Sequence, residues 1–76
     1  MNRTEWALNL LRDDFFLEMM EELRGMEITK FLNSDYKDIE LREEAYLRLR
    51  VLETLENHIQ GMADQKKIDE KKLKIL

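Results

Sequence analysis

The 76-residue sequence contains no cysteine, no proline and one histidine, and it has only two glycines. Without cysteine it can form neither a disulfide framework nor a thiolate metal site, and His58 alone is too little for a zinc site. Without proline, no residue inside a periodic segment lacks the backbone N–H that a helix needs. These absences, together with 39% charged residues, favour long helices and predict a protein without metal or cofactor.

Long hydrophobic runs are also lacking. No apolar stretch of 18 residues occurs, so no transmembrane helix is expected. The first 14 residues have neither the basic start nor the apolar block and small-residue cleavage site of a signal peptide. We therefore expect no contact with membranes and a location in the cytoplasm.

Catalytic motifs are absent as well. The sequence has no glycine-rich phosphate loop, no nucleophile elbow and no cysteine–histidine arrangement. Glu18 and Glu22, like Glu40 and Glu44, have the spacing that places two carboxylates on one helix face, but no Glu-x-x-His motif accompanies them. A solvated face explains both pairs, and we expect a protein that is not an enzyme and has no catalytic residue.

The net charge of −4 is unevenly distributed. Residues 1–63 carry 8 basic and 14 acidic side chains, whereas residues 64–76 carry 5 basic and 3 acidic ones. An acidic body lacks the basic footprint that displaces counterions from phosphate, so nucleic acid is an unfavoured partner. Nucleic-acid binding, as a possible function, would rest on the tail lysines alone: Lys66, Lys67, Lys71, Lys72 and Lys74.

Three segments have helical patterns. Thr4 is a plausible N-cap for a short helix over 4–12 that contains Trp6, and Asp13 can cap a second helix over 14–33. The polar stretch 33–38 predicts a loop, after which Asp38 caps a third helix over 38–62 that ends near Gly61. Residues 64–76 form a Lys-rich tail, either a helical extension or a frayed end. The predicted fold is all-α: a domain over 1–63 in which two antiparallel helices form a hairpin, the Trp6 segment folds onto one side, and oligomerisation completes the core.

The third segment carries a wide apolar arc. One series of its residues, spaced alternately by four and three, forms the predicted seam of an amphipathic helix: Leu41, Ala45, Arg48, Leu52, Leu55, Ile59 and Met62. Leu47, Val51 and Leu49 widen this arc beyond what one neighbouring helix can cover. We expect the protein to bind itself along this helix, most simply as a twofold dimer. The predicted interface comprises Leu41, Glu44, Ala45, Arg48, Val51, Leu52, Leu55 and Ile59.

Two polar features stand out on that segment. Glu44 and Arg48 lie four residues apart within the apolar arc. Arg48 either lays its stem on apolar surface with its guanidinium in water, or forms with Glu44 a polar pair that fixes the register of a helix interface. Tyr46 falls on the opposite side, where we expect it to be exposed and available to a partner.

The layout FFLEMMEELRGMEITKFLNS, a charged turn, then REEAYLRLRVLETLENHIQGM resembles a group of short proteins from tailed bacteriophages. The matching positions are an aromatic and a hydroxyl residue, an Arg-Glu-Glu-aromatic run, and a Leu-rich stretch ending in Leu-Glu-x-His: Phe31, Ser34, Arg42, Glu43, Glu44, Tyr46, Leu49, Leu52, Leu55, Glu56 and His58. The resemblance covers about residues 15 to 61. It implies a phage origin and a noncatalytic role beside the head or packaging machinery.

Two function classes follow. The first is a protein that acts by self-association or by docking on a larger phage structural component, in the cytoplasm of the bacterial host or in the virion. The second is a small acidic inhibitor of a host enzyme or defence protein, which only the acidic charge of residues 1–63 supports.

Overall fold

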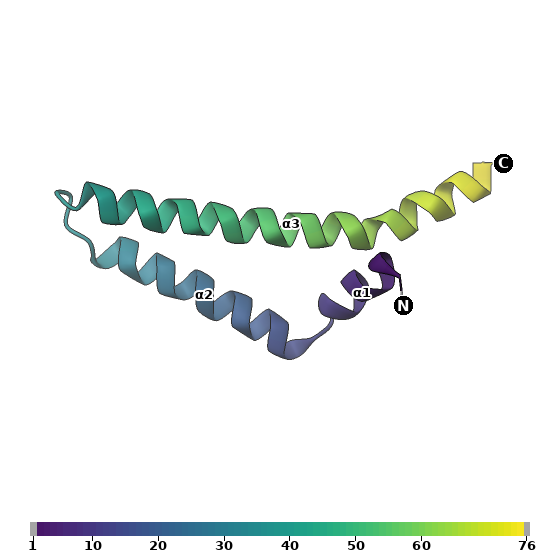
Figure 1. Cartoon of the computed structure of the whole chain (residues 1–76), viewed down its shortest axis with the longest axis horizontal. Helices are drawn as coiled ribbons and strands as arrows, with labels where there is room; N and C mark the ends of the chain where they lie inside the picture. The colour runs from purple at the N-terminus through teal and green to yellow at the C-terminus, as the bar shows by residue number, and fades with distance from the viewer. Residues whose placement is uncertain (1, 76) are drawn as a thin grey trace.

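The computed structural model describes the backbone of residues 2–75 and the side chains of residues 2–65. It contains three α-helices, α1 (Arg3–Leu10), α2 (Asp14–Asn33) and α3 (Ile39–Ile75), and no strand within the described backbone (Figure 1). The predicted all-α class is therefore confirmed, and α2 has the bounds that the sequence predicted.

Side-chain caps determine where the first two helices begin. Asn2 caps α1 by accepting a hydrogen bond from the Glu5 N–H at 2.8 Å, so the prediction of Thr4 as the cap was wrong. Asp13 caps α2 as predicted, with its Oδ1 2.9 Å from the N of Phe16. An acceptor at each cap satisfies N–H groups that have no partner within the helix, so Asn2 marks the start of α1 and Asp13 marks the break between α1 and α2.

The loop between α2 and α3 is closed by its own polar groups. The Ser34 hydroxyl donates to the carbonyl of Phe31 at 2.6 Å, and the Asp35 N–H donates to Oδ2 of Asp38 at 3.0 Å. The carbonyl of Asp38 then accepts the N–H of Arg42, so Asp38 immediately precedes the third helix as predicted. The short loop requires α2 and α3 to be antiparallel neighbours.

The third helix is longer than predicted. It passes through Gly61 and continues to Ile75, so the predicted end near residue 62 was wrong and the tail backbone is a helical extension. Many helices end at a glycine with a positive φ, but no glycine in the described backbone, Gly61 included, has one. A glycine in a helix costs about 1 kcal/mol relative to alanine, which the ladder of hydrogen bonds on either side can offset.

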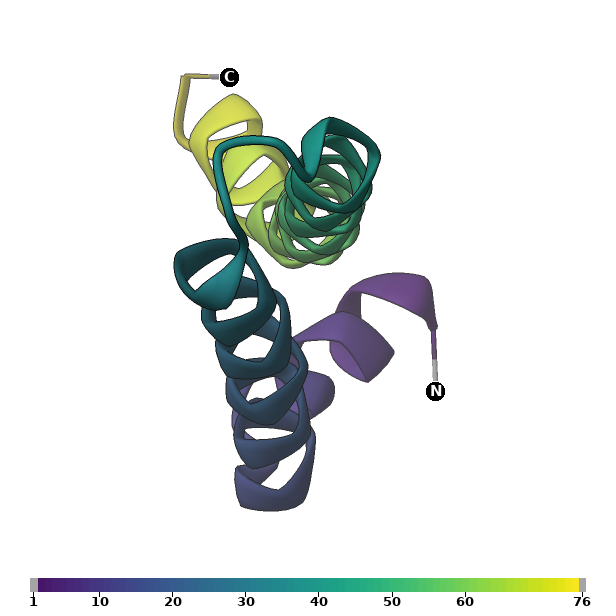
Figure 2. The same ribbon diagram turned by 90° about the vertical axis from the view of Figure 1, so that its left-hand side faces the viewer.

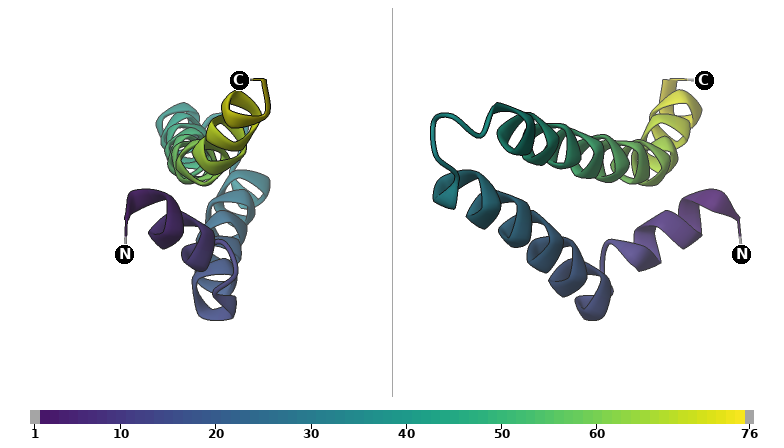
Figure 3. Two further views of the ribbon diagram at one scale, coloured as in Figure 1. Left: turned by 90° about the vertical axis from the view of Figure 1, so that its right-hand side faces the viewer. Right: turned by 60° about the vertical axis from the view of Figure 1, so that its left-hand side comes forward.

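The three helices form a triangle rather than a bundle. From the loop, α2 runs beside α3 and diverges from it, and α1 then turns back toward the second half of α3 (Figures 1 and 3). Both α1 and α2 lie on one side of α3, as the end view shows (Figure 2). The chain measures 59 × 25 × 15 Å, and the hairpin with the Trp6 segment folded onto it is confirmed.

The core is small. Its buried apolar residues, among the described side chains, are Ala7, Met20, Ala45, Ile59 and Ala63. Three of the five are alanines, and no large side chain is fully buried in the described part of the chain. The densest cluster lies between α1 and α3, where Leu8, Leu10, Leu11, Phe16 and Met62 surround the buried centre. Intrachain packing therefore leaves most of the large apolar side chains in water.

Candidate functional site

The side of α3 that faces the rest of the chain differs from the predicted seam. The buried and half-buried residues alternate at spacings of three and four: Arg42, Ala45, Leu49, Leu52, Glu56, Ile59 and Ala63. At 100° per residue, this seam is rotated by roughly 60° from the apolar series that begins at Leu41. Leu41 and Leu55 consequently lie on the flank of the hairpin instead of its centre.

Charged side chains occupy much of the contact between α2 and α3. Arg24 donates to the carboxylate of Glu56 across the two helices. Nearer the loop, the guanidinium of Arg42 lies 4.7 Å from the centre of the Phe31 ring, a cation–π geometry. The two helices thus meet through polar residues at positions where a helical hairpin usually places aliphatic ones.

Glu27 is the buried member of this polar contact. Only 8% of its surface is exposed, and Lys30 Nζ lies 3.2 Å from its Oε1. Its Oε2 has no hydrogen-bond partner, although Arg48 Nη1 of α3 lies 3.6 Å away as an ion pair. Sequence reasoning missed Glu27, yet its spacing of seven residues from Met20 and four from Phe31 places it on the inward side of α2 and was the available signal.

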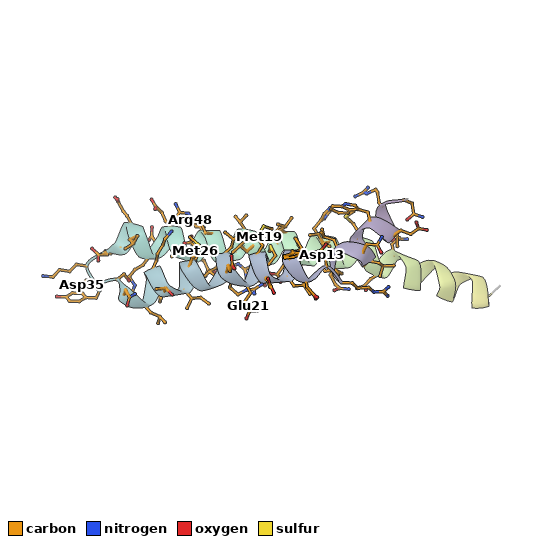
Figure 4. All side chains as sticks on the ribbon, turned by 90° about the horizontal axis from the view of Figure 1, so that it is seen from below. Asp13, Met19, Glu21, Met26, Asp35 and Arg48 are labelled. Atoms are coloured by element: carbon orange, nitrogen blue, oxygen red, sulfur yellow. The ribbon has the colours of Figure 1, made fainter. Side chains whose placement is uncertain are left out.

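One flank of the hairpin is apolar on both helices. Seven large side chains, each 38–66% exposed, make up what we call the apolar flank: Met19, Leu23 and Met26 of α2 with Leu41, Leu47, Val51 and Leu55 of α3. A groove between the helices joins the two rows and is lined by Leu23, Glu27, Arg48, Val51 and Leu52. Figure 4 shows Arg48 and Glu21 on opposite edges of the hairpin, with Met19 and Met26 nearer the Arg48 edge.

The structure divides the predicted interface residues. Leu41, Val51 and Leu55 are exposed on the apolar flank, and Leu52 is half-buried at the groove. Ala45 and Ile59 were wrongly assigned to an intermolecular surface, because the chain itself buries both of them. Ile59 packs with Ala7 of α1, and Ala45 lies in the part of the rotated seam that faces α2.

Arg48 connects the apolar flank to the polar contact. Its Nη2 lies 3.8 Å from Glu44 Oε2 on the same helix, while its Nη1 reaches toward Glu27 on α2. With Arg48 and Glu44 both more than half exposed, neither side chain is buried by the chain alone. The predicted Glu44–Arg48 pair is therefore present within the chain and lies at the edge of an open groove.

Tyr46 lies away from the apolar flank, as expected from its helical position. It is 56% exposed, close to the 59% of its neighbour Leu47, which belongs to the flank. These two adjacent residues lie at nearly the same height and point in directions about 100° apart around α3, because consecutive helical residues differ by that angle.

The remaining surface offers little for chemistry. A depression between α2 and α3 is lined by residues that include Phe16, Met20 and Glu56, and another near His58 includes Arg3 and Gln65. In the described part of the chain, no three histidine, cysteine or carboxylate side chains come together to hold a metal ion. Within the same part, no helix is long and apolar enough to cross a membrane.

The candidate functional site is therefore the apolar flank with its groove and the charged residues Glu27, Glu44 and Arg48. Comparisons of the chain with protein-family models, with curated proteins and with solved structures find no match.

Proposed function

We propose that the protein is a noncatalytic association module that binds a helical partner surface through its apolar flank. The observation that carries the proposal is the exposure of seven Leu, Met and Val side chains on α2 and α3, two of which, Leu23 and Val51, line the groove between the helices. Such a two-helix surface can receive further helices by the same ridges-into-grooves packing that joins helices within a core.

The size of the flank supports this function. The seven side chains are large and each is 38–66% exposed, whereas only five apolar residues are buried in the described part of the chain. A standard protein–protein interface takes about 800 Å² from each partner. The flank with its charged rim would form the centre of such an interface.

The biological setting we propose is phage assembly. The resemblance of residues 15 to 61 to short tailed-phage proteins supports a role in virion assembly or packaging, by self-association or by docking on a larger phage component. The protein would then work in the cytoplasm of the bacterial host or within the virion.

The proposal can be tested by sedimentation of lysates from phage-infected cells that make the tagged chain. Val51→Glu places a carboxylate in the middle of the apolar flank, and Tyr46→Glu places one at a similarly exposed position on the opposite side. We expect the parent chain and Tyr46→Glu to sediment with virions or their precursors, and Val51→Glu to remain in the slow fractions. A parent chain that never enters the fast fractions would contradict the assembly role.

A second candidate function has a specific observation in its favour. The start and outer edge of α2 carry five exposed carboxylates: Asp13, Asp14, Glu18, Glu21 and Glu22. Of these, Glu21 lies on the edge opposite Arg48 in Figure 4, and such an acidic surface would suit an inhibitor that binds a basic site on a host enzyme or defence protein. Glu21→Lys with Glu22→Lys would abolish that binding, whereas Val51→Glu would leave it intact.

A further inference from the structure

We propose that the occupant of the apolar flank is a second copy of the same chain, related by a twofold axis that runs across the helices. Each α3 then lies antiparallel on the α3 of its partner, and two hairpins form a four-helix assembly. This inference rests on the proposed function, because it names the partner of the same surface.

The charges on the flank are self-complementary. Four charged side chains lie at its groove and rim, two of each sign: Glu27, Lys30, Glu44 and Arg48. A twofold axis makes residue i contact residue j while j contacts i, so a surface must carry both signs to match its own copy. The antiparallel arrangement places Arg48 of one chain over Glu44 of the other, twice in each dimer.

The position of this pair agrees with the extent of the flank. On α3 the exposed apolar side chains run from Leu41 to Leu55, so the middle of that stretch is residue 48. An axis midway between Glu44 and Arg48 lies at the height of residue 46, two residues from that middle, and places Leu41 of one chain opposite Val51 of the other. Leu47, which lies one residue from that height, would face the Leu47 of the partner.

The open contacts of Arg48 would be completed in such a dimer. In the single chain its guanidinium lies 3.6 Å from Glu27 and 3.8 Å from Glu44, both longer than an ordinary charged hydrogen bond. A second copy would exclude water from the groove and so strengthen each of these attractions, since they increase as the local dielectric falls.

A small core explains why the partner should be the chain itself. Chains of this size gain only about 3–5 kcal/mol from a single hydrophobic core, and here three of the five buried apolar residues are alanines. A partner needed for folding must be present wherever the chain is made, and a second copy always is. Folding and dimerisation are then coupled, as in many obligate homodimers.

Cross-linking tests the axis directly, because the chain has no cysteine of its own. The variants Leu47→Cys and Tyr46→Cys introduce one thiol each, at neighbouring positions with 59% and 56% exposure whose side chains point about 100° apart around α3. With a short bifunctional maleimide, we expect Leu47→Cys to give covalent dimer at low protein concentration and Tyr46→Cys to give almost none. Equal cross-linking of the two variants, or none from Leu47→Cys, would overturn the proposed axis.

Charge exchange tests the pairing and does not depend on a cross-link. Arg48→Glu makes the pair of positions wholly acidic, and Glu44→Arg makes it wholly basic, so each variant alone should dimerise at least about tenfold more weakly. Mixing the two restores opposite charges at both contacts, and we expect heterodimers with the parent affinity by sedimentation equilibrium. If mixing gives no recovery, Glu44 and Arg48 act only within their own chain and the antiparallel pairing is wrong.

The outcomes separate this inference from the proposed function. A folded parent chain of monomer mass at high micromolar concentration would overturn the dimer, even if Val51→Glu still abolished sedimentation with virions. A dimer that cross-links through Leu47 but never enters the fast fractions would support the inference and contradict the assembly role.

Discussion

The two contacts that α3 makes within the chain differ in chemistry. Against α1 it places Ile59 and Ala63, which enclose Ala7 in a contact without charged residues at its centre. Against α2 it places Arg42, Arg48 and Glu56, which meet Phe31, Glu27 and Arg24. The first contact is apolar at its centre, whereas the second combines apolar residues such as Ala45 and Leu52 with charge pairs at the border of water.

This difference assigns different roles to the two contacts. Burial of apolar surface is insensitive to salt, whereas pairs between half-exposed charges contribute only about 0–1 kcal/mol and weaken as salt rises. The contact with α1 therefore fixes α1 on the second half of α3, while α2, which carries part of the apolar flank, is held less firmly. A partner that covers the flank would fix α2 from outside.

The largest expected effect comes from the apolar contact. Ile59→Ala removes a side chain that is 3% exposed and leaves a cavity beside α1, so we expect a loss of about 2–4 kcal/mol in the free energy of unfolding. Urea titration followed by far-UV circular dichroism, at one fixed protein concentration, measures it. A loss below about 1 kcal/mol would mean that this contact is no stronger than the polar one.

The polar contact should respond in the opposite direction. Glu27→Leu replaces a buried carboxylate that has one unbonded oxygen, while Lys30 and Arg48 remain exposed enough to be hydrated, at 42% and 53%. We expect the same titration to show unchanged stability or a gain of about 1–2 kcal/mol. Glu27→Gln is the control, since it keeps a buried polar group and should not give the gain. A clear loss in the free energy of unfolding for Glu27→Leu would show that the ion pairs hold α2 in place.

The two glycines provide one small test on each helix. An added Cβ at Gly25 of α2 or Gly61 of α3 would meet no atom within 4 Å, and neither residue has a positive φ. We expect Gly25→Ala and Gly61→Ala each to raise the free energy of unfolding by about 0.5–1 kcal/mol, because alanine favours the helix. Thermal melts check both. Destabilisation by Gly25→Ala alone would indicate a partner that approaches α2 closely at that residue.

The smallest effect is expected outside both contacts. Tyr46→Ala changes an exposed residue on α3, so the melting temperature should stay nearly unchanged, with less than about 0.5 kcal/mol lost. If Tyr46 contacts a partner protein, this variant would still weaken that binding. A large loss of stability would place Tyr46 in an interface that the isolated chain does not show.

Local signals in the sequence predicted the elements of this fold well. Asp13 and the polar loop before Asp38 mark the breaks, because their side chains satisfy backbone groups that the helices leave free. Gly61 misled the prediction of the third helix end, since glycine ends a helix only where the chain adopts a positive φ. The sequence did not decide between Asn2 and Thr4 as the cap of the first helix, because both residue types can cap. The hydrogen bond from the Glu5 N–H to Asn2 distinguishes them.

The candidate site was predicted only in part. A wide apolar arc shows that α3 has more than one apolar neighbour, but it does not determine which part of the arc faces α2. Leu49 and Leu52 face inward while Leu41 and Leu55 remain exposed, and in this rotation Glu56 of the seam meets Arg24 of α2. This choice depends on pairs between distant residues, such as Arg24 with Glu56, which the periodicity of one helix does not reveal.

Because α3 is unbroken, it also sets the distance and the direction of its far end relative to the rest of the chain. Between Ala63, the last buried residue of the described side chains, and Ile75, the helix advances about 18 Å at 1.5 Å per residue. Its phase is fixed as well as its length: deleting one residue beyond Ala63 would turn everything that follows by about 100°, whereas deleting seven would turn it by only about 20°. Any structure joined to the far end is thus held at a set distance and direction from the three-helix triangle.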